Sequence, residues 1–148
     1  MESIVDKALR IALSVHSGQT DKGGHPYILH PLRIMKRLNT PDEELMAIAL
    51  LHDAVEDSGG KLTFETLYRE GFSERVVGAL RLLTHGPTDD YQEYIRGIAA
   101  NRDATLVKLQ DLRDNSDVTR LKGLREKDFK RLAKYATAYN HLQQWGVR

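Results

Sequence analysis

The stretch LMAIALLHDAVEDS, residues 45–58, decides the fold because it is almost wholly apolar and yet contains His52, Asp53, Glu56 and Asp57. At ~3.6 residues per helical turn, His52 and Glu56 lie one turn apart, and so do Asp53 and Asp57. Burying carboxylates without partners is costly. The stretch therefore predicts a core helix whose acidic stripe faces a metal ion, Lys or Arg side chains, or water in a cleft.

Length and composition set the limits on the class of protein. The 148 residues predict one domain, residues 1–148, that can bury a core, and 41% hydrophobic with 29% charged residues is typical of a soluble globular chain. The net charge of +1 gives no reason to expect a nucleic-acid partner, and the absence of cysteine excludes disulfides, thiolate metal sites and a cysteine nucleophile. The N-terminus has no signal-peptide pattern and no run approaches the ~20 apolar residues of a membrane span. We therefore expect a cytoplasmic protein without membrane contact.

Helical periodicity recurs along the whole chain, whereas alternating strand patterns are hard to find. The first helix is expected to start at Ser3, which forms a capping box with Asp6, and to end before Gly18. Further helices are expected at about residues 30–38, 63–70, 73–83 and 128–145, and in YQEYIRGIAA and ATLVKLQDLRDN. The sequence thus predicts an all-α fold, a single compact helical bundle.

Two helix starts are predicted from capping residues alone. The segment TPDE places Thr40 as the cap, Pro41 at the first position and Glu43 closing a capping box, for a helix that carries the 45–58 stretch and ends at Gly59-Gly60. Thr88 or Asp89 is expected to cap the YQEYIRGIAA helix.

Three places put metal-binding side chains in apolar helical surroundings: His30, the His52-Asp53 pair, and Asp111. Two imidazoles and two carboxylates suit a divalent first-row ion such as Mn²⁺, with positions left for water and a substrate oxygen. Each residue alone is weak evidence, because an Asp such as Asp111 commonly pairs with a neighbour like Lys108. Their joint occurrence with an acidic pair one turn further along favours a metal site.

Three segments, HPYILHPLRI (25–34), ALLHDAVEDS (49–58) and VKLQDLRDN (107–115), resemble in order and spacing the motifs of HD-superfamily hydrolases. Within them, the chain is similar to the hydrolase domain of RelA/SpoT-type proteins, whose free-standing form is the small alarmone hydrolase. The resemblance implies an all-α domain that binds one Mn²⁺ and hydrolyses the 3′-pyrophosphate of ppGpp and pppGpp to GDP or GTP. It also implies roles for eight residues: His30, His52, Asp53 and Asp111 as metal ligands, Glu56 and Asp57 to orient and deprotonate water, and Tyr27 and Asn115 in the nucleotide pocket.

The residues themselves agree with these roles. Asn115 follows Asp111 by four residues and so shares its helix face. Positive charge for phosphates is expected mainly from Lys108, one turn before Asp111, and from Lys22.

One departure from the family concerns the substrate. The family turn before the YIxHP motif usually reads Gly-Gln-x-Arg, with the Arg near the guanine base, whereas GQTDKGG has Asp21 there and Lys22 next to it. An acid cannot make the cation–π contact of a guanidinium. An HD-type phosphohydrolase of another nucleotide with a 2′- or 3′-phosphate therefore stays an alternative, as do a non-catalytic nucleotide-binding module and a purely structural bundle.

Overall fold

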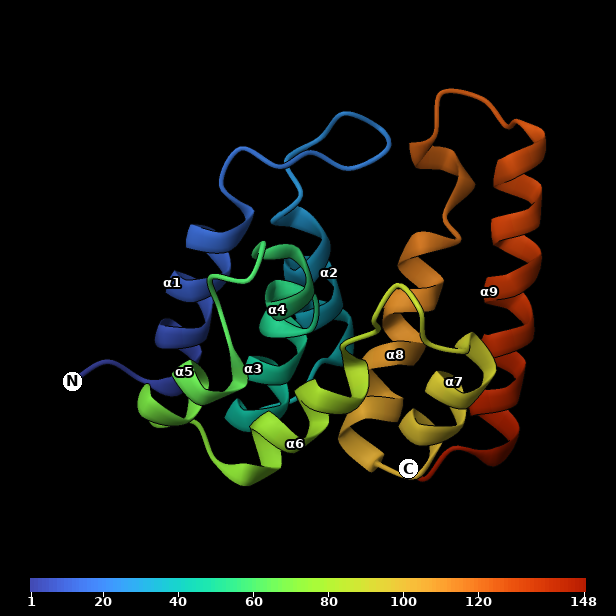
Figure 1. The fold of residues 1–148 in the computed structure, drawn as a ribbon. Helices are drawn as coiled ribbons and strands as arrows, with labels where there is room; N and C mark the ends of the chain where they lie inside the picture. Colours follow the sequence, from blue (N-terminus) through green and yellow to red (C-terminus); the bar gives the residue numbers. More distant parts are fainter.

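Helix α3 (Glu43–Leu51) runs through the middle of the computed structural model, which describes residues 1–148 (Figure 1). Most of its side chains are buried, and it packs against α1 (Ile4–His16), α2 (Leu29–Leu38), α6 (Glu74–Leu83) and α8 (Arg102–Asn115). Its apolar residues project in every direction around the helix, which is the pattern of a fully buried helix. Burial of α3 on all sides therefore holds the neighbouring helices in place.

The remaining elements complete the bundle around this core. Helix α4 (Ala54–Asp57) follows α3, α5 (Phe64–Arg69) packs on α6, and α7 (Tyr91–Ala99) and α9 (Glu126–Trp145) pack on α8. A short 3₁₀ turn, η1 (Val118–Arg120), lies between α8 and α9. There is no strand, only an isolated bridge between Thr20 and Pro26, so the all-α prediction is confirmed. That residues 1–148 form one domain stays a prediction.

Two loops meet at one end of the bundle. The loop of residues 17–28 and the segment 116–125 lie at the same end, next to the first turns of α9 (Figure 1). The loop of residues 17–28 leads directly into the first turn of α2, which contains His30.

None of the helices has the length and apolar character needed to cross a bilayer.

Several helices begin where the sequence predicts them. Ser3 caps α1 through a complete capping box with Asp6, and Thr63 and Ser73 cap α5 and α6 through hydrogen bonds from backbone N–H groups. Each side-chain oxygen satisfies an N–H group that has no partner within the helix. At these three positions the local sequence is sufficient to predict where the helix begins.

The two starts predicted at Thr40 and at Thr88 or Asp89 are wrong. Helix α3 is capped by Asp42, whose carboxylate accepts hydrogen bonds from the N–H groups of Glu44 and Leu45, while the Thr40 hydroxyl accepts one from Asp42. Helix α7 is capped by Asp90. Asp89 instead accepts a hydrogen bond from the Gly86 N–H and closes the preceding turn.

The prediction of one continuous helix from TPDE to Gly59-Gly60 is also wrong. Helix α3 ends at Leu51 and α4 begins at Ala54, so His52 and Asp53 form the junction between them. Asp53 has φ −106° and ψ −3°, away from helical values, and His52 Nδ1 donates a hydrogen bond to the Ala49 carbonyl at 2.7 Å. The two residues expected on the stripe of a straight helix instead sit at a turn.

Candidate metal centre

The four predicted metal ligands meet at one buried point. His30 comes from the first turn of α2, His52 and Asp53 from the α3–α4 junction, and Asp111 from α8. One donor atom from each lies within 4.8 Å of every other, and three of the four residues are buried. The structure thus brings together residues that are far apart in the sequence, and their donors could hold a metal ion.

Distances within the cluster are those of groups aimed at a common centre. His30 Nε2 lies 2.9 Å from Asp111 Oδ1 and 3.2 Å from His52 Nε2. His52 Nε2 lies 3.0 Å from Asp53 Oδ2. Because one oxygen or nitrogen of each residue faces the same point, an ion placed there would have a mixed N/O ligand set.

Hydrogen bonds on the far side of each imidazole set its tautomer. His52 Nδ1 donates to the Ala49 carbonyl, and His30 Nδ1 lies 2.6 Å from Asp114 Oδ2. A carbonyl and a carboxylate only accept, so both Nδ1 atoms bear a proton and both Nε2 atoms point to the cluster. This is the arrangement by which second partners orient histidine ligands.

The electrostatics of the cluster attract positive charge. Burial alone would lower the pKa of His52, but the charge of Asp53 and a hydrogen bond with Asp111 raise it well above its usual value. Burial would likewise lower the pKa of His30, which hydrogen bonds with Asp111 and Asp114 raise. The two carboxylates, Asp111 buried and Asp53 partly buried, therefore favour a cation at this point.

Glu56 and Asp57 lie on α4, directly after the junction. Glu56 Oε1 accepts a hydrogen bond from the His85 N–H at 2.8 Å, which ties α4 to the loop before α7. Burial raises the pKa of Glu56, and burial together with the charges of Asp53 and Glu56 raises the pKa of Asp57 to about 6. Both carboxylates are thus better proton acceptors at neutral pH than ordinary acidic residues.

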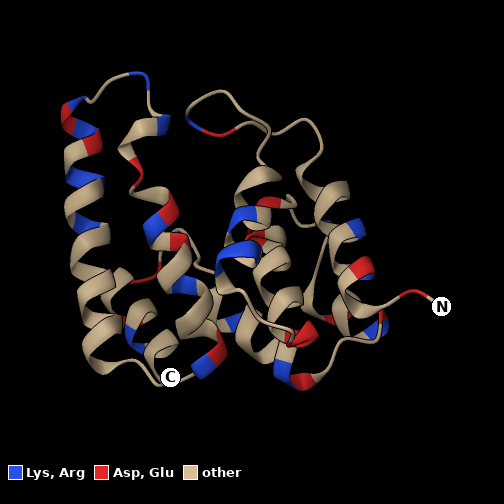
Figure 2. Ribbon diagram, turned by 180° about the vertical axis from the view of Figure 1, so that it is seen from behind, with Lys and Arg blue, Asp and Glu red and all other residues tan.

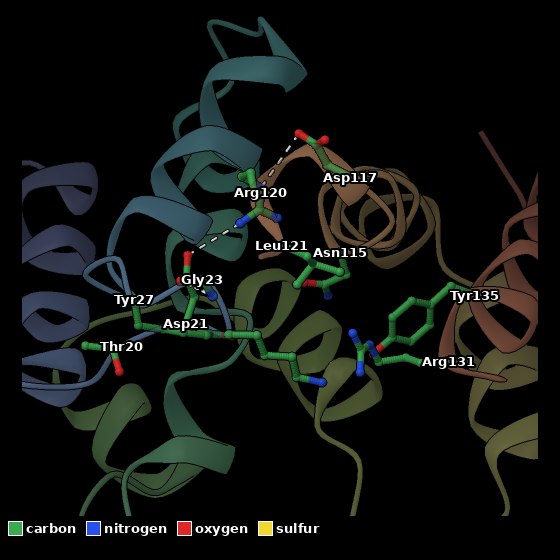
Figure 3. Close-up of a pocket in the computed structure, with 11 residues that line it drawn as sticks. Thr20, Asp21, Gly23, Tyr27, Asn115, Asp117, Arg120, Leu121, Arg131 and Tyr135 are labelled. Atoms are coloured by element: carbon green, nitrogen blue, oxygen red, sulfur yellow. Dashed lines mark hydrogen bonds and ion pairs between the residues drawn. The ribbon is translucent and has the colours of Figure 1, made fainter. Parts of the chain in front are cut away.

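A cavity of about 290 Å³, drawn in Figure 3, is lined by residues that contact the cluster. Tyr27 and Asn115 line it, and both touch metal-cluster residues: the Tyr27 hydroxyl donates to Asp53 Oδ2, and Asn115 Nδ2 donates to Asp111 Oδ1 at 2.9 Å. The contact expected from the spacing of Asn115 and Asp111 is therefore present. The roles of the two residues toward a nucleotide stay predictions.

The two predicted phosphate-binding lysines differ in placement. Lys22 lines the cavity. Lys108 is absent from the lining, its Nζ lies 2.8 Å from Asp111 Oδ2, and its side chain is 11% exposed. The Lys108 charge therefore balances Asp111, and its predicted contact with substrate stays a prediction.

Asp21 also lines the cavity, but its carboxylate is already occupied. It accepts hydrogen bonds at 2.9 Å from the Gly23 and His25 N–H groups, and Arg120 Nη1 lies 3.4 Å from its other oxygen. Figure 3 shows this contact between Arg120 and Asp21 at the edge of the cavity. A guanidinium therefore lines this cavity, although it comes from η1 rather than from the 17–28 loop.

Sequence reasoning missed a carboxylate that joins the cluster to this wall. Asp114 is fully buried and receives hydrogen bonds from His30, Arg33, Arg37 and Arg120. Burial alone would raise the pKa of Asp114, but the hydrogen bonds from His30 and Arg33 lower it below its usual value. The spacing of His30, Arg33 and Arg37, three and then four residues apart on α2, was the available signal for a face that needs an acid.

Two further cavity residues were missed on α9. Arg131 and Tyr135, four residues apart and hence on one face, form the wall opposite Asp21 (Figure 3). Their spacing was visible in the sequence, but nothing there indicated which way this face of the helix points.

The sequence of the chain is similar to those of several known proteins. The chain is 31% identical, over 97% of its length, to a guanosine-3′,5′-bis(diphosphate) 3′-pyrophosphohydrolase of Aquifex aeolicus, and covers 22% of that protein. It is 30% identical, over 74% of its length, to the bifunctional (p)ppGpp synthase/hydrolase SpoT of Escherichia coli, and covers 17% of it. The chain is an HD-type domain of the RelA/SpoT family.

The fold of this RelA/SpoT-type domain has a solved counterpart. A structure described as a metazoan ortholog of SpoT that hydrolyzes ppGpp superimposes with a TM-score of 0.78 over 99% of this chain and 89% of the other, at 24% identity. No family model matches the chain. The RelA/SpoT-type domain spans about a fifth of the length of the curated relatives named above.

Proposed function

We propose that this protein is a metal-dependent phosphohydrolase that removes the 3′-pyrophosphate from the guanosine alarmones ppGpp and pppGpp. The products are GDP or GTP and pyrophosphate. The observation that carries the proposal is the buried set of two imidazoles and two carboxylates, with donor atoms within 4.8 Å of one another, beside the Glu56-Asp57 pair. Relatives whose names state this reaction support the choice of substrate.

The donor set fits Mn²⁺. His30, His52, Asp53 and Asp111 would hold the ion, and with no cysteine in the chain the ligands are only nitrogen and oxygen. When bound, a divalent ion supplies Lewis acidity, which lowers the pKa of water and withdraws charge from phosphoryl oxygens.

The residues of the chain supply the proton transfer and the positioning. Glu56 is the proposed general base: His85 N–H holds one of its carboxylate oxygens, and its raised pKa suits proton acceptance near neutral pH. Asp57, next to it, helps orient the attacking water. Tyr27, Asn115 and Lys22 line the cavity that would hold the nucleoside.

A second candidate is hydrolysis of another nucleotide with a 2′- or 3′-phosphate. The observation that favours it is Asp21, whose carboxylate accepts two backbone hydrogen bonds at the place of the family arginine. A changed pocket wall can change the base that is recognised while the hydrolytic centre stays the same.

The test is pyrophosphate release from ppGpp by the Mn²⁺-loaded protein, beside a panel of nucleotides with 2′- or 3′-phosphates. Glu56→Gln should lose about 100-fold or more of the turnover, because it removes the general base, and should keep the metal content of the wild type. Glu93→Gln, an exposed glutamate on α7, is the control and should leave turnover unchanged.

Other results would redirect or reject the proposal. Turnover of a panel nucleotide without turnover of ppGpp would select the second candidate. Binding of nucleotides without any turnover would mean a nucleotide-binding module, and wild-type turnover in Glu56→Gln would mean that another group is the base.

A further inference from the structure

A second cavity, of about 620 Å³, adjoins the one beside the metal cluster. The two cavities share Lys22, Leu121 and Arg131 in their linings. The second is completed by the 122–125 loop and the first turn of α9. A molecule that lies in the first cavity with one end at the metal cluster would therefore extend past Lys22 and Arg131 into the second.

Positive charge dominates the second cavity. Its lining contains five cationic residues, Lys22, Lys122, Arg125, Lys127 and Arg131, and one acidic residue, Asp128. Figure 2 shows Lys and Arg along the first turns of α9 and in the loop before it, at the end of the molecule that also bears the 17–28 loop.

The single acid does not balance these cations. The Asp128 carboxylate accepts hydrogen bonds from the Arg125 backbone N–H at 2.9 Å and from Arg131 at 2.8 Å, so it is used within α9. Lys22, Lys122 and Lys127 make no ion pair within 4.0 Å. Burial lowers the pKa of Lys22, and the nearby charges of Arg131 and Lys127 lower it further.

Helix stability does not account for these cations. Arg125 is the N-cap of α9 and Lys127 lies in its first turn. The N-terminus of a helix bears partial positive charge, so basic residues there are unfavourable and acidic ones are preferred. A cationic cluster at this end is instead what a polyanionic ligand needs.

We propose that the second cavity binds the 5′-phosphate chain of the nucleotide whose 3′-pyrophosphate is hydrolysed at the metal cluster. This inference rests on the proposed function and adds the position of the other end of the substrate. The nucleoside would lie in the first cavity, and the 5′-phosphates would contact Lys22, Lys122 and Lys127. A longer 5′-phosphate chain reaches more of these cations, so pppGpp binds more tightly than ppGpp.

Kinetics of two exposed lysine variants test the site. Lys122→Ala and Lys127→Ala should each raise KM for pppGpp roughly fivefold, as expected for one partly exposed charge pair, with a smaller effect on ppGpp. The effect should fall on KM rather than kcat, because neither lysine lines the cavity beside the metal cluster. Lys130→Ala, an exposed lysine of α9 outside the cavity, is the matched control and should change neither KM.

Equilibrium binding of GMP, GDP and GTP separates this inference from the proposed function, since it needs no hydrolysis. Affinity should rise with each 5′-phosphate in the wild type, and the rise should be lost in the Lys122→Ala/Lys127→Ala double variant. If alarmones are not hydrolysed but this dependence is found, the phosphate site stands and the proposed function fails. If the double variant keeps the wild-type dependence and the wild-type ratio of KM for pppGpp and ppGpp, the phosphate site is wrong.

Discussion

Replacing Asp114 by Asn tests whether one buried carboxylate supports both the metal cluster and the cavity wall. Asp114 receives one hydrogen bond from His30, two from Arg33, one from Arg37 and one from Arg120, all of 3.2 Å or less. Asparagine has nearly the same shape but no charge, and its amide NH₂ faces donors where an oxygen was. The substitution therefore removes the charge and one acceptor with little change in volume.

The expected loss of stability follows from the exposure of the partners. Removing one member of a buried ion pair costs about 3–5 kcal/mol, because the other charge is left uncompensated. Here the side chains of Arg33, Arg37 and Arg120 are 28%, 37% and 25% exposed, so water can partly solvate them. We therefore expect the lower end of that range, a fall of about 3 kcal/mol in the free energy of unfolding.

Asp114→Asn is also expected to weaken metal binding, for a reason independent of the loss of stability. The Asp114 carboxylate fixes the tautomer and orientation of His30, and loss of such a partner typically weakens metal binding about 10- to 100-fold. Stability is measured by chemical denaturation in the presence of a chelator, and metal affinity by calorimetric titration with Mn²⁺. Asp117→Asn is the control: Asp117 also lies near Arg120, but it is partly exposed, and asparagine preserves its capping role.

Wild-type stability and wild-type metal affinity in Asp114→Asn would refute the reasoning. They would mean that the three arginines and His30 hold their positions without this charge. A loss of stability without any loss of metal affinity would restrict Asp114 to packing α2 against α8.

Two further predictions concern charge at the cluster. Asp57 has a folded pKa of about 6 against 3.8 for the free side chain, so its contribution to stability is present at low pH and is lost as pH rises through 6. Asp57→Asn should therefore raise the unfolding free energy of the chelated protein at neutral pH by about 1 kcal/mol, a value reduced for solvent exposure, and should make no difference below pH 3.8; an equal effect at both pH values would contradict the assignment. Chelation of the metal-loaded protein should lower its melting temperature, and Mn²⁺ at about 100 times Kd should restore about 2.7 kcal/mol of stability; melting that does not respond to either reagent would indicate a purely structural bundle.

How far the sequence predicts the fold depends on whether a helix start is determined locally. Ser3, Thr63 and Ser73 each stand before an apolar helix, and each caps a helix that begins where the sequence predicts it. At residues 40–42 two residues can cap, and a tertiary contact decides between them: Arg75 Nη2 of α6 lies 2.6 Å from Asp42 Oδ2. The sequence around residues 40–42 cannot reveal this contact, because Arg75 is 33 residues away in the chain.

The same distinction applies to the candidate site. The contact of Asn115 with Asp111 follows from their spacing on one helix and is found at 2.9 Å. The contact of Asp114 with His30 joins residues 84 apart and exists only because α2 packs on α8. Sequence reasoning therefore finds the groups that bind a metal more readily than the groups that orient them.

The prediction of one straight helix did not include the break between α3 and α4. Consecutive residues of a regular helix point in directions about 100° apart and do not face each other. His52 Nε2 and Asp53 Oδ2 nevertheless lie 3.0 Å apart, because the backbone leaves the helical conformation at Asp53. An uninterrupted helix would direct only one of the two toward His30 and Asp111. The apolar residues of the 45–58 stretch thus form a buried helix, and the helix is interrupted at His52 and Asp53, so that both side chains can face His30 and Asp111.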